Sequence, residues 1–520
     1  MISDEENFHE FVYKLFYKFS NARPEQAGLI LSRSTVGPVI ETKPDVQMSI
    51  PLPKKIEEDY AFEGMLFENT DEGRRSIWSL FFATLYHLAA HAAISDYAIY
   101  DNWRKNKTQD VVLDVINFIE DLRVERYIER NDPDVWRACS SVESTLGEYL
   151  KETKESAGKK KQYRQAENER NTDDLKARIL KTSDEDKEEL VKVADYLYNN
   201  RNLLAPILLP CREHRIQGWS LKFEKRGPAL APFGIFEEQV EKIDELWQQD
   251  ERTKTQILRR YKKHMKNLHF DSIIIPPGNL QAFVQIKSKT LPLLRRIRQQ
   301  IRMISNMTDD PKIDQIGYVD MQMAIQAIAS EGMSTDIFER DELRRGEEAW
   351  VILVDKSASM SLRFDQLKEF TVCVSESAND LTGKQDAWAL YSFDNNFHIL
   401  KDFKEKYTQE IQSRIGTIEN GGLSLLPDAI DLSYKILSED PRERKYIFVI
   451  TDGSASGYAR IQEAFSKLVK KIDASGTTLI AIGVSKSTTK RFRNNVRGGD
   501  LKTLVAKFIT AYRTAASSDP

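Results

Sequence analysis

The chain has few of the residues that mark a secreted protein. Only three cysteines occur in 520 residues, Cys139, Cys211 and Cys373, and they lie far apart. An odd, scattered set excludes a disulfide framework and a CxxC metal site. The opening residues, Met1-Ile2-Ser3-Asp4-Glu5-Glu6, are acidic, whereas a signal peptide begins with basic residues. We therefore expect a cytoplasmic protein in a reducing compartment.

Neither sign of charge dominates the chain. It has 76 basic and 80 acidic side chains, which give a net charge of −4. This balance argues against general nucleic-acid binding, which needs a basic surface. The sequence also contains no GxxxxGK[ST] motif, so we expect no ATPase engine of the P-loop type.

Long apolar runs are scarce, and a single stretch is similar to a membrane span. It covers residues 77–94 and contains His87 and His91. The run is barely long enough for a bilayer, and the two imidazoles make insertion costly. We predict a helix buried on all sides within a helical domain, and no membrane span.

His87 and His91 stand four residues apart, so both project from the same face of that helix. This is the spacing of a zincin histidine pair, but Leu88 occupies the position of the general-base Glu. A transition metal is therefore a hypothesis, and the alternative is a pair of histidines hydrogen-bonded within the core. With carboxylates of the next helical pattern, residues 108–130, the possible ligands are His87, His91, Glu120, Asp121 and Glu125.

A second candidate site lies in the last third of the chain. Residues 350–354 form a continuous apolar run, which predicts a buried parallel strand, and Asp355-Lys356-Ser357-Ala358-Ser359 follows directly. A later strand candidate, residues 446–451, ends in Asp452-Gly453. Between them, Gly421-Gly422-Leu423-Ser424 carries a hydroxyl into a helical pattern. Ligands of open α/β sheets bind beyond such strand ends, and Mg²⁺ prefers oxygen donors.

This pattern resembles the metal-ion-dependent adhesion site of von Willebrand factor A domains. The resemblance implies the ligands Asp355, Ser357, Ser359, Ser424 and Asp452. Ser424 stands where that family usually has Thr, which keeps the hydroxyl. The expected ion is Mg²⁺, with Mn²⁺ or Ca²⁺ as alternatives. The simpler interpretation is an Asp and two Ser that merely cap a helix.

The C-terminal region alternates strand and helix patterns. Strands are predicted at 349–354, 387–393, 446–451 and 477–484, with helices between them. This order predicts a doubly wound, mostly parallel sheet, and residues 397–400 predict a short antiparallel edge strand.

The predicted fold class is therefore multi-domain, with an all-α N-terminal and middle region and a C-terminal α/β von Willebrand factor A domain. The domains are an N-terminal helical domain with the His-x-x-x-His pair, a charged insertion with a helical middle region, and the von Willebrand factor A domain with its adhesion site. Their bounds are 1–150, 151–345 and 346–520.

Further motifs resemble the NorD/CbbO family, von Willebrand A proteins known as nitric oxide reductase activation proteins and rubisco activase adaptors. They are the helix residues Glu120-Asp121-Leu122-Arg123-Val124-Glu125 after the His pair, Arg295-Arg296, Asp320, and Arg344-Arg345 ahead of the Asp355 strand. Arg414-Ile415-Gly416 before the metal loop also fits.

The resemblance implies a non-catalytic adaptor. Such a protein binds a hexameric MoxR-type AAA+ ATPase and recruits a metalloenzyme client, through a carboxylate of the client, for activation, remodelling or cofactor insertion. Two alternatives remain open: a chelatase-like subunit for metal insertion into a tetrapyrrole, and a metal-dependent hydrolase, which Leu88 disfavours.

Overall fold

The computed structural model describes most of the chain as helices and strands with their side chains. The described residues are 7–33, 35, 37–42, 45–156, 187–200, 226–231, 233, 237–308, 318–319, 338–339, 348–382, 384–453, 456, 458, 461–483, 492, 494–496 and 498–517. Cys211, Asp320, Arg344, Arg345 and most of the charged insertion lie outside them.

These residues form two compact units. Unit 1 comprises residues 1–254, 277–284 and 408–416, and unit 2 comprises residues 255–276, 285–407 and 417–520. Helices α7 and α8 each begin in unit 1 and end in unit 2. Residues 408–416 belong to unit 1 although they stand within the C-terminal region of the sequence.

Unit 1 is built on helices with two small sheets. Its elements are α1 (Phe8–Ser20), β1 (Ala27–Ser32), β2 (Val39–Glu41), β3 (Val46–Pro51), β4 (Lys54–Ile56), β5 (Asp59–Phe62), β6 (Met65–Phe67), α2 (Asp71–Ile94), η1 (Tyr97–Tyr100), α3 (Gln109–Asn131), α4 (Pro133–Ser156), α6 (Lys187–Asn199), the first part of α7 (Glu237–His264), the start of α8 (Leu280–Thr308) and α11 (Gln409–Gly416). The sheets have the orders β1-β3-β2 and β4-β5-β6.

The prediction of an all-α N-terminal region was therefore wrong. Six strands of three to six residues precede α2. Strand β1 pairs in parallel with β3, which is separated from it along the chain by the antiparallel β2. Strands this short carry little periodicity, so their local pattern did not reveal them.

Helix α2 is the buried helix that the sequence predicts. Every residue from Ser76 to His91 is buried, because α1, α3, α4 and strands of both sheets pack around the helix. The Thr70 side chain caps its start by accepting a hydrogen bond from the Gly73 amide. Among the described residues α2 alone is long and apolar enough to cross a membrane, yet 83% of that stretch is buried inside the protein. It is therefore weak evidence for a membrane span.

Unit 2 is an α/β unit. Its elements are the end of α7, β7 (Ile273–Ile274), the rest of α8, β8 (Tyr318–Val319), β9 (Phe338–Glu339), β10 (Glu348–Asp355), η6 (Ala358–Arg363), α10 (Phe364–Thr382), β11 (Trp388–Phe393), β12 (Phe397–Lys401), α12 (Leu426–Ser438), β13 (Arg444–Thr451), α13 (Ile461–Ala474), β14 (Thr477–Gly483), β15 (Asn494–Val496) and α14 (Leu501–Ser517). The four strands predicted around Asp355 and Asp452 match β10, β11, β13 and β14 within two residues.

The main sheet has seven strands in the order β15-β14-β13-β10-β11-β12-β7. All neighbouring pairs are parallel except β11 with β12, which are antiparallel as predicted. The prediction that β12 is an edge strand was wrong, because the two-residue strand β7 pairs with it. A strand of two residues has no detectable pattern, and the prolines that follow it predict a break in regular structure here.

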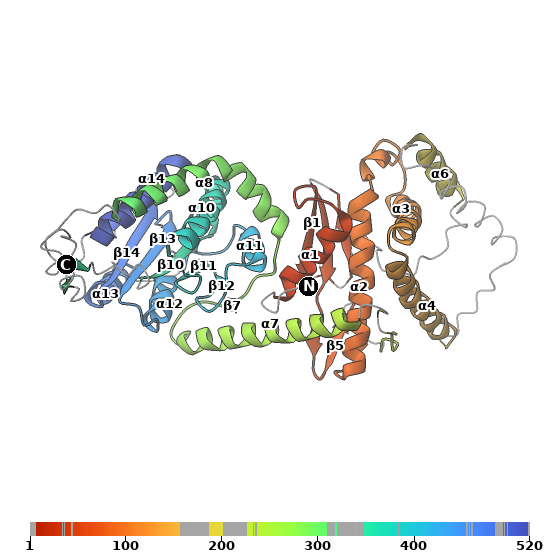
Figure 1. Cartoon of the computed structure of the whole chain (residues 1–520), viewed down its shortest axis with the longest axis horizontal. Helices are drawn as coiled ribbons and strands as arrows, with labels where there is room; N and C mark the ends of the chain where they lie inside the picture. Colours follow the sequence, from red (N-terminus) through yellow and green to blue (C-terminus); the bar gives the residue numbers. More distant parts are fainter. Residues whose placement is uncertain are drawn as a thin grey trace, which may run out of the picture. The chain divides into compact units, whose positions relative to one another are not determined.

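Helices cover both faces of this sheet. Figure 1 shows α10 and α14 on one face and α12 and α13 on the other. Side chains alternate accordingly along β10: the Trp350 ring packs on Phe448 and on Tyr512 of α14, whereas Val351 and Leu353 belong to the core cluster that includes α12. Burial on both faces explains why β10 reads as a continuous apolar run.

A buried ionic network ties three distant segments of unit 1 together. Glu410 of α11 is 3% exposed and accepts hydrogen bonds from Arg414 at 2.6 Å and from Asn7 at 3.1 Å, and lies 2.9 Å from Lys254 of α7. Burial raises the pKa of Glu410, but the charges of Arg414 and Lys254 outweigh burial and hold that pKa well below its usual value. Glu410 is thus ionised and pairs with both buried cations, and Asp250 of α7 is a second carboxylate partner of Lys254.

We expect Glu410→Ala to destabilise unit 1 by about 3–5 kcal/mol, because Arg414 and Lys254 would each lose a buried carboxylate partner, although Lys254 would keep the ion pair with Asp250. Chemical denaturation followed by circular dichroism measures the change. Glu419→Gln, at an exposed position, is the control and should change the stability by less than about 0.5 kcal/mol. Equal effects of the two substitutions would contradict the role assigned to this network.

Candidate functional site

The residues of the predicted adhesion site gather at the carboxyl edge of the main sheet. Strand β10 ends at Asp355, and its parallel pairing with β13 sets Val354 opposite Ile450, so Thr451 lies beside Asp355. Oδ2 of Asp355 accepts hydrogen bonds from the hydroxyls of Thr451 at 2.8 Å and Ser424 at 2.9 Å. The Asp355 side chain itself is fully buried.

The two serines after β10 complete this group. The Ser357 amide donates to Oδ1 of Asp355 at 3.1 Å, and the hydroxyls of Ser357 and Ser359 lie 3.1 Å apart. Ser357 is buried, whereas Ser359 is exposed, so the group runs from a buried carboxylate to the protein surface. The helix-cap alternative does not describe this geometry, since Ser357 precedes η6 and makes no side-chain cap bond.

Backbone contacts hold the three segments in place. The Ala358 amide donates to the Gly422 carbonyl at 3.0 Å, and the Ser456 amide donates to the Ser424 carbonyl at 2.9 Å. Gly422 has a φ of +73°, and a Cβ there would lie 2.8 Å from that of Asp394, so only glycine fits this turn. The loop position of the Ser424 hydroxyl is therefore determined by backbone conformation on both sides.

The structure brings together four of the five predicted residues through hydrogen bonds: Asp355, Ser357, Ser359 and Ser424. The fifth, Asp452, is half-buried and follows Thr451 directly at the end of β13. Sequence reasoning did not assign a role to Thr451, whose hydroxyl binds Asp355 and accepts from the Gly453 amide at 3.0 Å. The predicted parallel pairing of the two strands would have indicated that Thr451 lies beside Asp355.

The electrostatics of Asp355 favour a cation. Burial raises the pKa of Asp355 to about 6, against the opposing effect of the hydrogen bonds that it accepts. The adjacent Lys356 is paired with Asp394 at 2.7 Å, and Asp355 forms no ion pair with any described residue. A buried carboxylate without a counter-charge is stabilised by a cation held among oxygen ligands.

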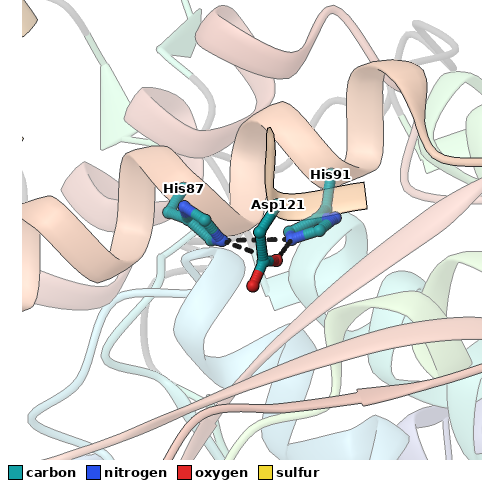
Figure 2. A group of neighbouring side chains, drawn as sticks. All are labelled: His87, His91 and Asp121. Carbon is teal, nitrogen blue, oxygen red and sulfur yellow. Dashed lines mark hydrogen bonds and ion pairs between the residues drawn. The ribbon is translucent and has the colours of Figure 1, made fainter. Parts of the chain in front are cut away.

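The histidine pair lies in unit 1. His87 and His91 of α2 face Asp121 of α3, and all three are buried (Figure 2). The other two predicted ligands are not part of this group. Glu120 pairs with Arg123 at 2.9 Å and accepts a hydrogen bond from Tyr100 at 2.7 Å. The ligand atoms of His87, His91 and Asp121 lie within 4.8 Å of one another, and Glu125 does not join them at that distance.

Comparison with known families identifies the C-terminal domain. The family model described as von Willebrand factor type A domain matches residues 350–454, and the chain therefore contains such a domain. A protein of Pseudomonas aeruginosa, itself described as uncharacterized, is 24% identical over 198 residues. That match covers 36% of this chain and 31% of the relative, so the chain spans about a third of the length of the curated relative it matches.

Solved structures give distant matches. A von Willebrand factor type A protein from Catenulispora acidiphila is 19% identical, with a TM-score of 0.26, and the match covers 33% of this chain and 43% of that one. Proximal thread matrix protein 1 from the mussel byssus is 20% identical, also with a TM-score of 0.26, and the match covers 32% and 47% of the two chains.

The site geometry predicts the effect of two matched substitutions. Ser424→Ala removes a hydroxyl that lies 2.9 Å from Asp355, and we expect it to weaken Mg²⁺ or Mn²⁺ binding at least about tenfold, that is by about 1.4 kcal/mol. Ser424→Thr keeps the hydroxyl and should bind the ion as the parent does. Isothermal titration calorimetry measures both affinities, and equal loss in the two variants would contradict the assignment of the hydroxyl as a ligand.

Proposed function

We propose that this chain is a non-catalytic cytoplasmic adaptor whose von Willebrand factor A domain binds partners through a Mg²⁺ ion. The domain indicates a role in protein–protein interaction or adhesion. The proposal adds a hexameric MoxR-type AAA+ ATPase as one partner and, as the other, a metalloenzyme client that offers a carboxylate. The ligands are Asp355, Ser357, Ser359, Ser424 and Asp452, and Mn²⁺ or Ca²⁺ are alternative ions.

The observation that carries this proposal is the ligand set. Asp355 is bonded to the Ser424 hydroxyl, and three of the five ligands are neutral hydroxyls. Asp355 and Asp452 balance the charge of a divalent ion, and a site completed by neutral hydroxyls and water keeps a ligand that can be replaced. A carboxylate of another protein can take that position, so partner binding depends on the metal.

The surface around the site fits a protein partner. Leu423, directly before Ser424, is 51% exposed, and Leu362, three residues after Ser359, is 97% exposed. Large apolar side chains at this exposure, beside a charged centre, are typical of interaction surfaces. A small-molecule enzyme site would bury such side chains in a pocket.

The chain itself supplies no energy source for remodelling. It lacks a phosphate-binding loop, so any ATP-driven step must come from a partner. The histidine pair does not supply hydrolysis by the zincin route either, because Leu88 stands where that route needs a glutamate. Binding and recruitment are therefore the functions that these residues support.

The first experiment is co-purification of the full chain with the MoxR-type ATPase encoded nearest to its gene. We expect a complex that stimulates ATP hydrolysis in Mg²⁺ and dissociates in EDTA. Asp355→Ala should reduce the retained partner at least about tenfold. Absence of a complex in every condition, or full retention by Asp355→Ala, would contradict the proposal.

Asp473→Asn is the matched control for that experiment. Asp473 is exposed near the end of α13 and precedes β14, so it lies at the amino edge of the parallel sheet, opposite the site. The Asp473→Asn substitution removes one acidic charge, as Asp355→Ala does, and should leave the complex intact.

A second prediction separates partner binding from metal binding. Leu362→Ser and Leu423→Ser remove apolar area beside the site and should weaken the complex by about 1–3 kcal/mol each, with Mg²⁺ affinity unchanged. Calorimetry measures the affinity for Mg²⁺, and a binding assay with the purified ATPase or client measures the affinity for the protein partner. A parallel loss of both affinities would show that these leucines support the loop and do not contact a partner.

A further inference from the structure

Three ligand atoms meet in the interior of unit 1, where α2 crosses α3. Nε2 of His87 and Nε2 of His91 lie 3.3 and 3.0 Å from the same oxygen, Oδ1 of Asp121, and 3.1 Å from each other (Figure 2). The three residues are 1%, 1% and 3% exposed. The closely spaced ligand atoms thus form a triangle, away from solvent.

Hydrogen bonds fit this triangle poorly. If both imidazoles donate Nε2–H to the same oxygen of Asp121, the two donor nitrogens lie only 3.1 Å from each other. If one imidazole instead accepts from the other, its Nε2 lone pair lies close to the carboxylate oxygen of Asp121.

A cation at the centre satisfies all three atoms, because each then presents a lone pair to it. Zinc bonds nitrogen and oxygen at about 2.0–2.2 Å in tetrahedral geometry, which separates neighbouring ligands by roughly 3.3–3.5 Å. The observed separations of 3.0–3.3 Å are slightly shorter and close to this value. A small outward movement of the side chains would complete the coordination.

The surroundings provide part of an outer shell. Nδ1 of His91 lies 2.9 Å from the Ser95 hydroxyl and 3.1 Å from that of Tyr97. With Nε2 on a metal, Nδ1 carries the proton and donates to these oxygens, the usual arrangement for a ligand histidine. Nδ1 of His87 is buried and has no hydrogen-bond partner among the described residues, so hydrogen bonding at that nitrogen does not offset the burial of the ring.

We propose that His87, His91 and Asp121 bind a divalent transition-metal ion, with zinc as the expected ion, and that this ion cross-links α2 to α3. Imidazole and carboxylate donors suit zinc and its first-row neighbours, whereas Mg²⁺ and Ca²⁺ prefer oxygen alone. Water would fill the fourth position. Because the site is buried and Leu88 replaces a general base, its role is structural.

Metal analysis of the full chain, purified without a histidine tag, tests this inference. We expect about one transition-metal ion per chain in the parent and at least about tenfold less in His91→Asn and in Asp121→Asn. After exchange with Co²⁺, the parent should show the visible d–d absorption of a tetrahedral site. A chelator selective for transition metals, added with Mg²⁺ in excess, should lower the melting temperature of the parent and leave both variants unchanged, since only the parent gains stability from the transition-metal ion.

His264→Asn is the matched control, because His264 lies on α7 in unit 2 and pairs with Glu439 at 2.7 Å. It should retain the metal. A folded parent with less than about one ion per ten chains and no Co²⁺ absorption would overturn the inference, as would equal metal content in the parent and both variants. If the variants fail to fold, the Co²⁺ spectrum of the parent decides the question.

Discussion

The parallel pairing of β10 with β13 is the constraint on which the candidate site depends. It aligns two strand ends at one edge of the sheet, so that Asp355 of one strand meets the Thr451 hydroxyl of the other. The loop before α12 adds Ser424 because Gly422 allows the chain to turn there. A change of register by one residue would direct these side chains to the opposite face of the sheet.

Both candidate metal sites rest on the same electrostatic principle. Each places a buried carboxylate among neutral donors, hydroxyls around Asp355 and imidazoles around Asp121. They differ in donor type and access. The exposed Ser359 and Leu423 connect the first site to the surface, which suits a replaceable partner ligand, whereas the second is enclosed by helices, which suits a permanent cross-link.

Buried charge also determines which segments of the chain belong to unit 1. Glu410 stands more than 400 residues after Asn7 and lies within the C-terminal region of the sequence, yet it is bonded to Asn7, Lys254 and Arg414. The local sequence of α11 does not indicate these partners. Burial of Arg414 and Lys254 is costly unless carboxylates such as Glu410 and Asp250 lie beside them.

Local sequence determined the elements whose pattern is strong. The apolar runs that become β10 and β13, the buried helix α2, and the Asp-x-Ser-x-Ser motif at a strand end were all predictable, because burial on both faces leaves a continuous apolar signature. The four-residue spacing of His87 and His91 likewise placed them on one face.

Only the tertiary structure decided which side chains meet. It selected Asp121 from three candidate carboxylates and paired Glu120 with Arg123, a choice made by the rotation and packing of α3 against α2. Only the structure shows that the Thr451 hydroxyl donates to Asp355, that short strands precede α2 and that β7 pairs with β12 in the main sheet. The β4-β5-β6 strands pair with their sequence neighbours but are too short to show a period. The other features depend on contacts between residues far apart in the chain, and such contacts leave no periodic trace in the sequence.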